Sequence, residues 1–259
     1  MYFDTHAHYD SGAFNADRKE LLASMPQKGV ELIVNPGCDL ESSRTAVALA
    51  EEFPHVYAAV GVHPSDCGEW GEGTLLELRQ LASRPKVRAI GEIGLDYYWH
   101  KEREEHLLQQ KVFRQQMDIA REKKLPFMIH SRDAAEDTLN IVREYMRDGM
   151  YGGIIHCFSY SKEIAREYLN MGLYLGIGGV VTFKNSRKLK EVVEYAPLNQ
   201  ILLETDCPYM APVPNRGKRN SSLYLPEVVK TIAEIKGVSY EEVVAVTESN
   251  AMKVLNLIK

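Results

Sequence analysis

Short apolar segments rich in β-branched residues alternate along the chain with longer segments in which apolar residues recur every three or four positions. The short segments predict β-strands, and the longer segments predict amphipathic helices. Strands are expected at residues 2–8, 30–35, 56–62, 87–94, 126–130, 153–158, 173–177 and 201–206. Helices are expected at residues 16–27, 41–52, 74–83, 102–123, 134–147, 162–170, 187–194 and 226–235, and from Ser239 onward.

Helix-boundary residues agree with this division. Asp133 and Glu136 have the spacing of a capping box, Ser161 precedes a helix, and Gly29, Gly149 and Gly172 lie where helices should end. Strands that alternate with helices predict a parallel sheet. Eight such units in 259 residues favour a (β/α)8 TIM barrel that forms a single domain over residues 1–259. An open doubly wound sheet is the alternative, but the glycine loop that usually follows its first strand is not visible.

Composition narrows the class of protein. The first residues read directly as a strand, and no apolar run approaches the roughly 20 residues that span a bilayer. Without a secretory leader, we expect a cytoplasmic protein with no membrane association. The net charge of −5 argues against a nonspecific nucleic-acid coat protein. It does not argue against a nuclease, since bound divalent ions reverse the local charge.

Cysteine spacing gives no sign of disulfides or of a Cys-based metal site. The four cysteines include no C-x-x-C pair, so we expect reduced thiols. Cys157 and Cys207 each follow a candidate metal ligand. On a strand they should therefore point to the opposite side from that ligand.

Candidate chemistry gathers where the predicted strands end, which is where such barrels carry their active sites. His6 and His8 lie one residue apart, so on a strand both imidazoles point the same way. The later strand ends supply Glu92, His130, His156 and Asp206. A single histidine at a strand end is usually structural. Four imidazoles and two carboxylates in one cavity without a metal would leave polar groups unpaired, at a cost of a few kcal/mol each.

The set is large enough for two divalent ions. Glu92 is the candidate bridge, His6, His8 and Asp206 complete one ion's ligands, and His130 and His156 complete the other's. Paired ions can stabilise both the attacking and the leaving oxygen in phosphoryl transfer. Asp206 is the candidate general base, and with Glu92 it forms the expected catalytic pair. Magnesium, manganese and zinc are all considered, although imidazoles suit zinc and manganese better than magnesium.

Further residues are candidates to support the ligands or the substrate. Asp4 shares a strand face with the first two histidines, and Glu204 shares one with Asp206, so each carboxylate could orient a metal-binding imidazole. A buried salt bridge is the alternative for both acids. Arg132 could hold a phosphate or pair with a neighbouring acid. His63, after the third strand, is a candidate to position the substrate.

An aromatic run follows the fourth strand, and a basic loop follows the last strand. The segment 214–220 carries Arg216, Lys218, Arg219 and Asn220, which could hold a nucleic-acid backbone or form a solvated loop. The residues at 97–99 are Tyr-Tyr-Trp, which could stack a base or pack as a lid.

Seven segments together resemble the TatD family of metal-dependent hydrolases. They are Phe3–His8, Gly61–Pro64, Gly91–Tyr97, Ile129–Arg132, Ile155–Phe158, Leu203–Asp206 and Arg216–Asn220. The resemblance implies a distorted (β/α)8 barrel, a divalent metal site and magnesium-dependent DNase activity, commonly 3′ to 5′ on single strands. It also implies metal ligands at His6, His8, Glu92, His130, His156 and Asp206. The chain departs from the family pattern at Ser221 and Ser222, where an acidic residue and a proline are common.

We therefore expect a two-metal phosphodiesterase acting on DNA ends, with a monomer assumed. A small-molecule amidohydrolase is one alternative, but such enzymes often carry a carbamylated lysine where this chain has Glu92. A D-aminoacyl-tRNA deacylase is another alternative. A metal-bearing scaffold without turnover is disfavoured by the intact set of ligands with Asp206.

Overall fold

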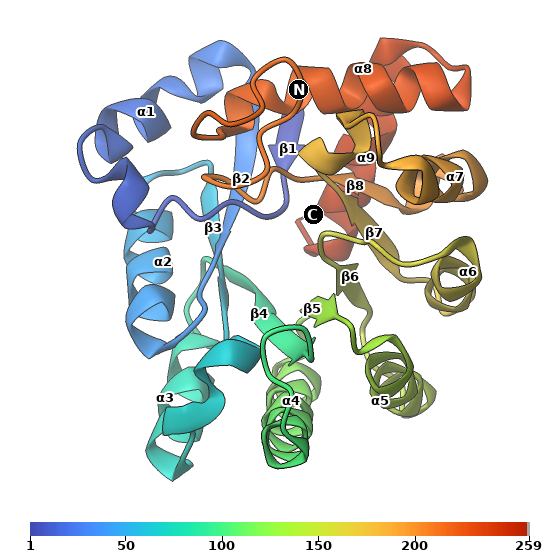
Figure 1. Ribbon diagram of the computed structural model, residues 1–259. Helices are drawn as coiled ribbons and strands as arrows, with labels where there is room; N and C mark the ends of the chain where they lie inside the picture. The colour runs from blue at the N-terminus through green and yellow to red at the C-terminus, as the bar shows by residue number, and fades with distance from the viewer. Residues whose placement is uncertain (258–259) are drawn as a thin grey trace.

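A single parallel sheet organises the chain. The computed structural model describes residues 1–257, in which eight strands pair in chain order and every pair is parallel. The strands are β1 (Tyr2–Asp4), β2 (Val30–Pro36), β3 (Val56–Val60), β4 (Val87–Asp96), β5 (Phe127–Arg132), β6 (Gly153–Ile155), β7 (Tyr174–Ile177) and β8 (Ile201–Leu203). Figure 1 shows them as a ring with helices around the outside. The predicted (β/α)8 barrel is confirmed, in a nearly closed form.

The helices follow the predicted order. They are α1 (Arg18–Ser24), α2 (Leu40–Glu52), α3 (Glu72–Leu81), α4 (Arg103–Lys123), α5 (Ala135–Arg147), α6 (Lys162–Asn170), α7 (Arg187–Tyr195), α8 (Leu225–Lys236) and α9 (Tyr240–Val254). The first is shorter than the predicted segment 16–27, because Pro26 has no N–H and begins a separate 3₁₀ turn. No helix among the described residues is both long and apolar enough to cross a bilayer.

One predicted helix cap is wrong. Helix α5 has Ala134 at its N-cap position and no side-chain cap, while Asp133 before it is in the left-handed region at φ 54°. The predicted stops hold at Gly29, Gly149 and Gly172, whose φ values are 84°, 80° and 78°. These glycines take a conformation that a Cβ would strain, so they end their helices.

The barrel closes at the carboxyl ends of its first and last strands. The sheet order of the described residues runs from β1 to β8 without a ladder that joins these two strands. Backbone hydrogen bonds join the chain just beyond them instead: Asp206 N donates to His6 O at 2.9 Å, and His8 N donates to Cys207 O at 2.8 Å. This seam therefore fixes the residues that carry the histidine pair beside Asp206.

Two apolar clusters stabilise the barrel. The larger one lies between the sheet and the surrounding helices. The smaller one contains inward-facing strand residues such as Phe3, Val34 and Leu202, with Val254 and Leu255 at the end of α9 packed against them. Figure 1 accordingly shows α9 beside β8, against which this helix packs. Helix α9 thus fills one mouth of the barrel and leaves the carboxyl-end mouth for the polar residues.

Candidate metal centre

A cavity of about 610 Å³ opens at the carboxyl ends of the strands. Five of the six predicted ligands line it, namely His8, Glu92, His130, His156 and Asp206, and the sixth, His6, lies fully buried against them. His63 and Arg132 also line the cavity, so both proposed substrate contacts are in reach of the same space.

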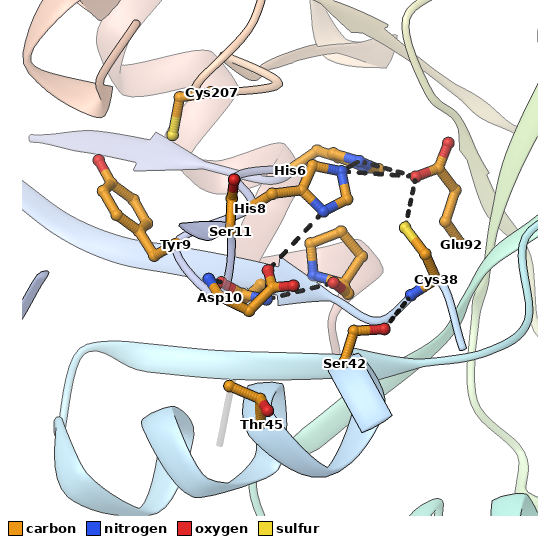
Figure 2. Close-up of polar contacts among 12 residues, drawn as sticks. His6, His8, Tyr9, Asp10, Ser11, Cys38, Ser42, Thr45, Glu92 and Cys207 are labelled. Atoms are coloured by element: carbon orange, nitrogen blue, oxygen red, sulfur yellow. Dashed lines mark hydrogen bonds and ion pairs between the residues drawn. The ribbon is translucent and has the colours of Figure 1, made fainter. Parts of the chain in front are cut away.

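Glu92, near the middle of β4, stands between two groups of imidazoles and is only 4% exposed. Its Oε2 lies 3.3 Å from His6 Nε2 and 3.5 Å from His8 Nε2. Its Oε1 lies 3.0 Å from His130 Nδ1 and 3.8 Å from His156 Nε2. Figure 2 shows the rings of His6 and His8 pointing toward this carboxylate. Each carboxylate oxygen therefore faces a separate group of ring nitrogens, as a bridging ligand would.

Asp206 lies at the edge of the ligand cluster where the chain beyond β1 meets the chain beyond β8. Its Oδ1 lies 3.4 Å from His8 Nε2, 3.6 Å from His6 Nε2 and 3.9 Å from His156 Nε2. The φ of 54° at Asp206 turns the chain away from the strand direction immediately after β8. The aspartate therefore faces both imidazole groups.

Neighbouring acceptors fix which nitrogen of each ring carries its proton. His6 Nδ1 lies 3.0 Å from Met128 Sδ, and His156 Nδ1 lies 3.1 Å from Glu204 Oε2. Sulfur and carboxylate accept hydrogen bonds here, so both Nδ1 atoms carry a proton, and in the neutral form of each ring Nε2 presents a lone pair to the centre. Glu204 has room because β7 carries Gly176, where a Cβ would lie 2.1 Å from Glu204 Oε2. The predicted partnership between Glu204 and an imidazole is thus seen in the geometry.

His130 and His63 differ in what they present to Glu92. His130 Nε2 lies 3.0 Å from Asp96 Oδ2, so the proton is on Nε2 and the Nδ1 lone pair faces Glu92. His63 Nδ1 accepts a hydrogen bond from Ser65 N at 3.1 Å, so neutral His63 carries its proton on Nε2. That Nε2 lies 3.7 Å from Glu92 Oε1. His63 is therefore placed as a donor, whereas His130 is placed as a metal ligand.

Charge at the centre follows from these contacts. Burial opposes ionisation of Glu92, but the imidazoles of His6 and His130 outweigh it and hold the pKa of this carboxyl well below its usual value. Burial lowers the pKa of His6. Burial also opposes protonation of His156, yet the charge of Glu204 raises the pKa of this imidazole to about 9. The cluster therefore holds a positive charge on an imidazole where a bound cation would provide it.

Asp4 has a different surrounding from the one its strand position suggested. Its carboxylate accepts hydrogen bonds from Thr205 Oγ1 and Ser222 Oγ, both at 2.6 Å, and from the backbone N of Thr205 and His6. Burial raises the pKa of Asp4 to about 7. The expected contact with an imidazole ring is replaced by bonds that tie β1 to the segments after β8. The contacts of the Asp4 carboxylate are therefore with hydroxyl and backbone N–H groups, and not with an imidazole ring or a basic side chain.

The basic loop 214–220 does not line the cavity. Arg219 forms an ion pair with Asp17 at 2.5 Å, and Arg216 lies over the ring of Phe183 at 4.3 Å. Asn220 is fully buried and donates to the backbone oxygens of Thr205 and Tyr209. Arg219 and Asn220 are therefore engaged within the protein, whereas Arg216 and Lys218 remain exposed.

One prediction about the cysteines is wrong, namely that Cys157 points to the opposite side of its strand from the ligands. All four cysteines are free, as expected. Cys157 does not point away from the site, because β6 ends at Ile155 and Cys157 has φ 44°, so strand alternation no longer applies. It lines the cavity, and its N–H donates to Glu204 Oε1 at 2.7 Å.

Three residues near the centre were not among the predicted site residues. Cys38 Sγ lies 4.0 Å from Glu92 Oε2, and Figure 2 shows the sulfur pointing to that carboxylate. Asp10 accepts from Asn35 Nδ2 at 2.8 Å and has its Oδ1 3.9 Å from His8 Nδ1. Asp96 holds His130. Only Asp10 and Asp96 had a sequence signal, since each lies within four residues of a predicted ligand.

The donor set fits divalent cations. Imidazole and carboxylate atoms within 4.8 Å of one another form the groups His6–His8–Glu92 and His6–His156–Asp206, and Glu92 and His130 recur in a third group with His63. Lone pairs that converge from buried imidazoles onto carboxylate oxygens need a proton or a metal between them. Together with the barrel, this set of ligands defines a metal-dependent hydrolase of the (β/α)8 class.

Comparison with known proteins gives the family. The sequence matches the family described as "TatD related DNase" over residues 3–256. It is 42% identical over 257 residues to "Uncharacterized metal-dependent hydrolase YabD" of Bacillus subtilis strain 168, covering 99% of this chain and 100% of that protein. It is 32% identical over 261 residues to "3'-5' ssDNA/RNA exonuclease TatD" of Salmonella typhimurium, covering 99% of each.

A solved structure agrees with these sequence matches. The crystal structure of YjjV, a TatD homologue from Escherichia coli K12, superposes with a TM-score of 0.90 at 29% identity and covers 98% of both chains. The chain belongs to the TatD family of metal-dependent hydrolases, as the sequence motifs indicated.

Proposed function

We propose that this protein is a 3′ to 5′ exonuclease of single-stranded nucleic acid that uses two divalent metal ions. The observation that carries the proposal is the position of Glu92, whose two oxygens each face a separate group of imidazole nitrogens. The name of the Salmonella relative, an exonuclease of single-stranded DNA and RNA, supports the substrate class. Manganese, zinc and magnesium remain the candidate ions.

In this proposal Glu92, His6, His8 and Asp206 would hold one ion, and Glu92, His130 and His156 would hold the other. When bound, the ions would supply positive charge to the attacking and leaving oxygens of a phosphodiester. All other contributions come from protein side chains that already lie around the cavity.

Asp206 is the proposed general base. Burial opposes its ionisation, but a hydrogen bond with His8 and the nearby imidazoles lower the pKa of this carboxyl below its usual value. Its side chain is 15% exposed and lines the cavity, so water can reach it. Asp206 would accept the proton of the attacking water as that water's oxygen forms a bond to phosphorus, while the bond between phosphorus and the leaving oxygen breaks and that oxygen takes up a proton from solvent.

His63 and Arg132 are the proposed phosphate contacts. The Nε2–H of His63 and the guanidinium of Arg132 are hydrogen-bond donors at the lining of the same cavity, whereas the predicted ligands would present lone pairs. Donors that face the nonbridging oxygens would orient the phosphate while the ligands hold the cations. Glu92 at the bridging position, in place of a lysine, continues to argue against an amidohydrolase with a carbamylated lysine.

The test is cleavage of single-stranded DNA and RNA labelled separately at the 3′ and 5′ ends. Protein stripped of metal is reloaded with magnesium, manganese or zinc, and Asp206→Asn is assayed beside it. Stepwise loss from the 3′ end that needs metal and disappears in the variant is expected. Absence of cleavage with every metal, with mischarged tRNA hydrolysed instead, would contradict the nuclease and favour the deacylase.

A further inference from the structure

Tyr98 and Trp99 follow β4 beside the cavity, and packing within the fold does not account for their exposed rings. Trp99 is 68% exposed and Tyr98 is 41% exposed. Tyr97, the preceding residue, behaves differently: its ring stacks on His106, and its hydroxyl donates to Asp137. Packing therefore accounts for Tyr97 but not for the two rings that follow it.

Arg132 connects this pair to the cavity. Its guanidinium lies 3.8 Å from the centre of the Tyr98 ring and 5.6 Å from the centre of the Trp99 ring, and Arg132 also lines the cavity. The Tyr98 and Trp99 rings meet edge to face with centroids 4.7 Å apart. Because Arg132 covers the ring of Tyr98, the exposed ring of Trp99 is the surface left for a ligand.

Asp96 ties the aromatic pair rigidly to the metal centre. Its Oδ1 accepts hydrogen bonds from the backbone N of Tyr98 and of Trp99, each at 3.0 Å. Its Oδ2 accepts from His130 Nε2, also at 3.0 Å. Asp96 is almost fully buried, so one fixed carboxylate positions both a candidate metal ligand and the two aromatic residues. A group bound on Trp99 would be held in register with the centre.

The local charge suits a nucleotide. Lys101 Nζ lies 5.3 Å from the centre of the Tyr98 ring, so two cations flank the aromatic pair in a chain whose net charge is −5. Aromatic rings accept any nucleobase by stacking, and cations beside them attract the phosphate.

We propose that Trp99, supported by Tyr98 and Arg132, is a stacking site for the terminal nucleobase of a nucleic-acid substrate. The inference rests on the proposed function, and it adds the part of the substrate that the protein recognises. Recognition would be by base stacking and therefore tolerant of base identity. The same site would disfavour phosphodiesters that lack a base.

The first experiment measures kcat and KM of the metal-loaded protein on single-stranded DNA whose 3′-terminal residue is either thymidine or an abasic analogue. Trp99→Ala is expected to raise KM for the thymidine end about tenfold, equivalent to about 1.4 kcal/mol, with little change in kcat. KM for the abasic end should not change, and Trp99→Phe should restore most of the affinity. Leu76→Ala, which removes another exposed apolar side chain on α3, is the matched control.

The second experiment keeps this inference separate from the nuclease proposal. Thymidine 5′-monophosphate is titrated into metal-loaded protein while tryptophan fluorescence is followed, with inorganic phosphate as the comparison. The chain has two tryptophans, and Trp70 is engaged with Gln115, so quenching should disappear in Trp99→Phe. Quenching without cleavage of DNA would support the stacking site and reject the nuclease. Cleavage with a KM that is insensitive to Trp99→Ala, or equally affected on abasic ends, would overturn the stacking site.

Discussion

Replacing Glu204 by glutamine tests whether the residues behind the ligands control metal binding. Glu204 is fully buried and accepts two hydrogen bonds, from His156 Nδ1 at 3.1 Å and from Cys157 N at 2.7 Å. Glutamine has nearly the same shape but only one accepting oxygen. Its amide would therefore direct an N–H at one of the two donors, and His156 would lose its anionic partner.

The size of the effect follows from that one contact. A hydrogen bond to a charged group contributes about 1.5–3 kcal/mol. Since about 1.4 kcal/mol corresponds to a tenfold change in an equilibrium constant, the manganese affinity of the form with neutral His156 should fall roughly ten- to hundredfold. A loss of this size is typical when a residue that orients a metal-binding histidine is replaced. The pKa of His156 in metal-free protein, about 9 in the native chain, should fall as well.

The assay is calorimetric titration of metal-free Glu204→Gln with manganese, together with NMR titration of the His156 ring. Glu167→Gln is the matched control, because Glu167 is a surface acid paired with Arg143. Activity at saturating metal should recover in part, since the ligands themselves are intact. Native affinity with a lowered His156 pKa would refute the argument that Glu204 supports the centre through His156.

The remaining predictions concern other contacts of the site. Gly176→Ala should weaken metal binding as Glu204→Gln does, because the new Cβ would lie 2.1 Å from Glu204 Oε2 and displace that side chain. The same calorimetric titration measures the effect. Unchanged metal affinity would contradict the steric argument. Metal affinity should rise with pH up to about 9, since protonated His156 cannot bind a cation; calorimetry in buffers of different ionisation enthalpy should show proton release at pH 7.5. Arg132→Ala should raise KM for oligonucleotides about tenfold, whereas Arg219→Ala should leave KM unchanged and cost at most about 1 kcal/mol of stability, because its surface ion pair makes a small contribution. Steady-state kinetics and denaturant unfolding separate the two outcomes.

Sequence alone was sufficient for features that repeat or that depend on one strand at a time. The eight alternating units predicted the barrel, and strand-end residues predicted the cluster around Glu92 even though β1 and β8 stop before their ligands begin. His6 and His8 still converge, because the seam between the first and last strands continues the extended chain. A barrel brings the carboxyl ends of its strands to one mouth whatever the exact strand lengths are.

Features that depend on where a strand stops, or on a distant segment, were not predictable. Cys157 was expected to face away, but the chain turns immediately after β6. Arg219 and Asn220 resembled a phosphate-binding loop until the fold brought Asp17 and the backbone of Thr205 to them. The pairing of Arg219 with Asp17, 202 positions away, leaves no periodic signal in the sequence. Burial then decides whether a polar side chain faces substrate or protein.

The position of the seam has a consequence for biosynthesis. His6 and His8 are synthesised before Asp206, which follows the last strand of the barrel and is held beside them by backbone hydrogen bonds. A nascent or prematurely terminated chain that lacks this strand can therefore present two histidines without the carboxylate that completes their site. Hydrolytic competence would therefore appear only after the residues that follow β8 have been made.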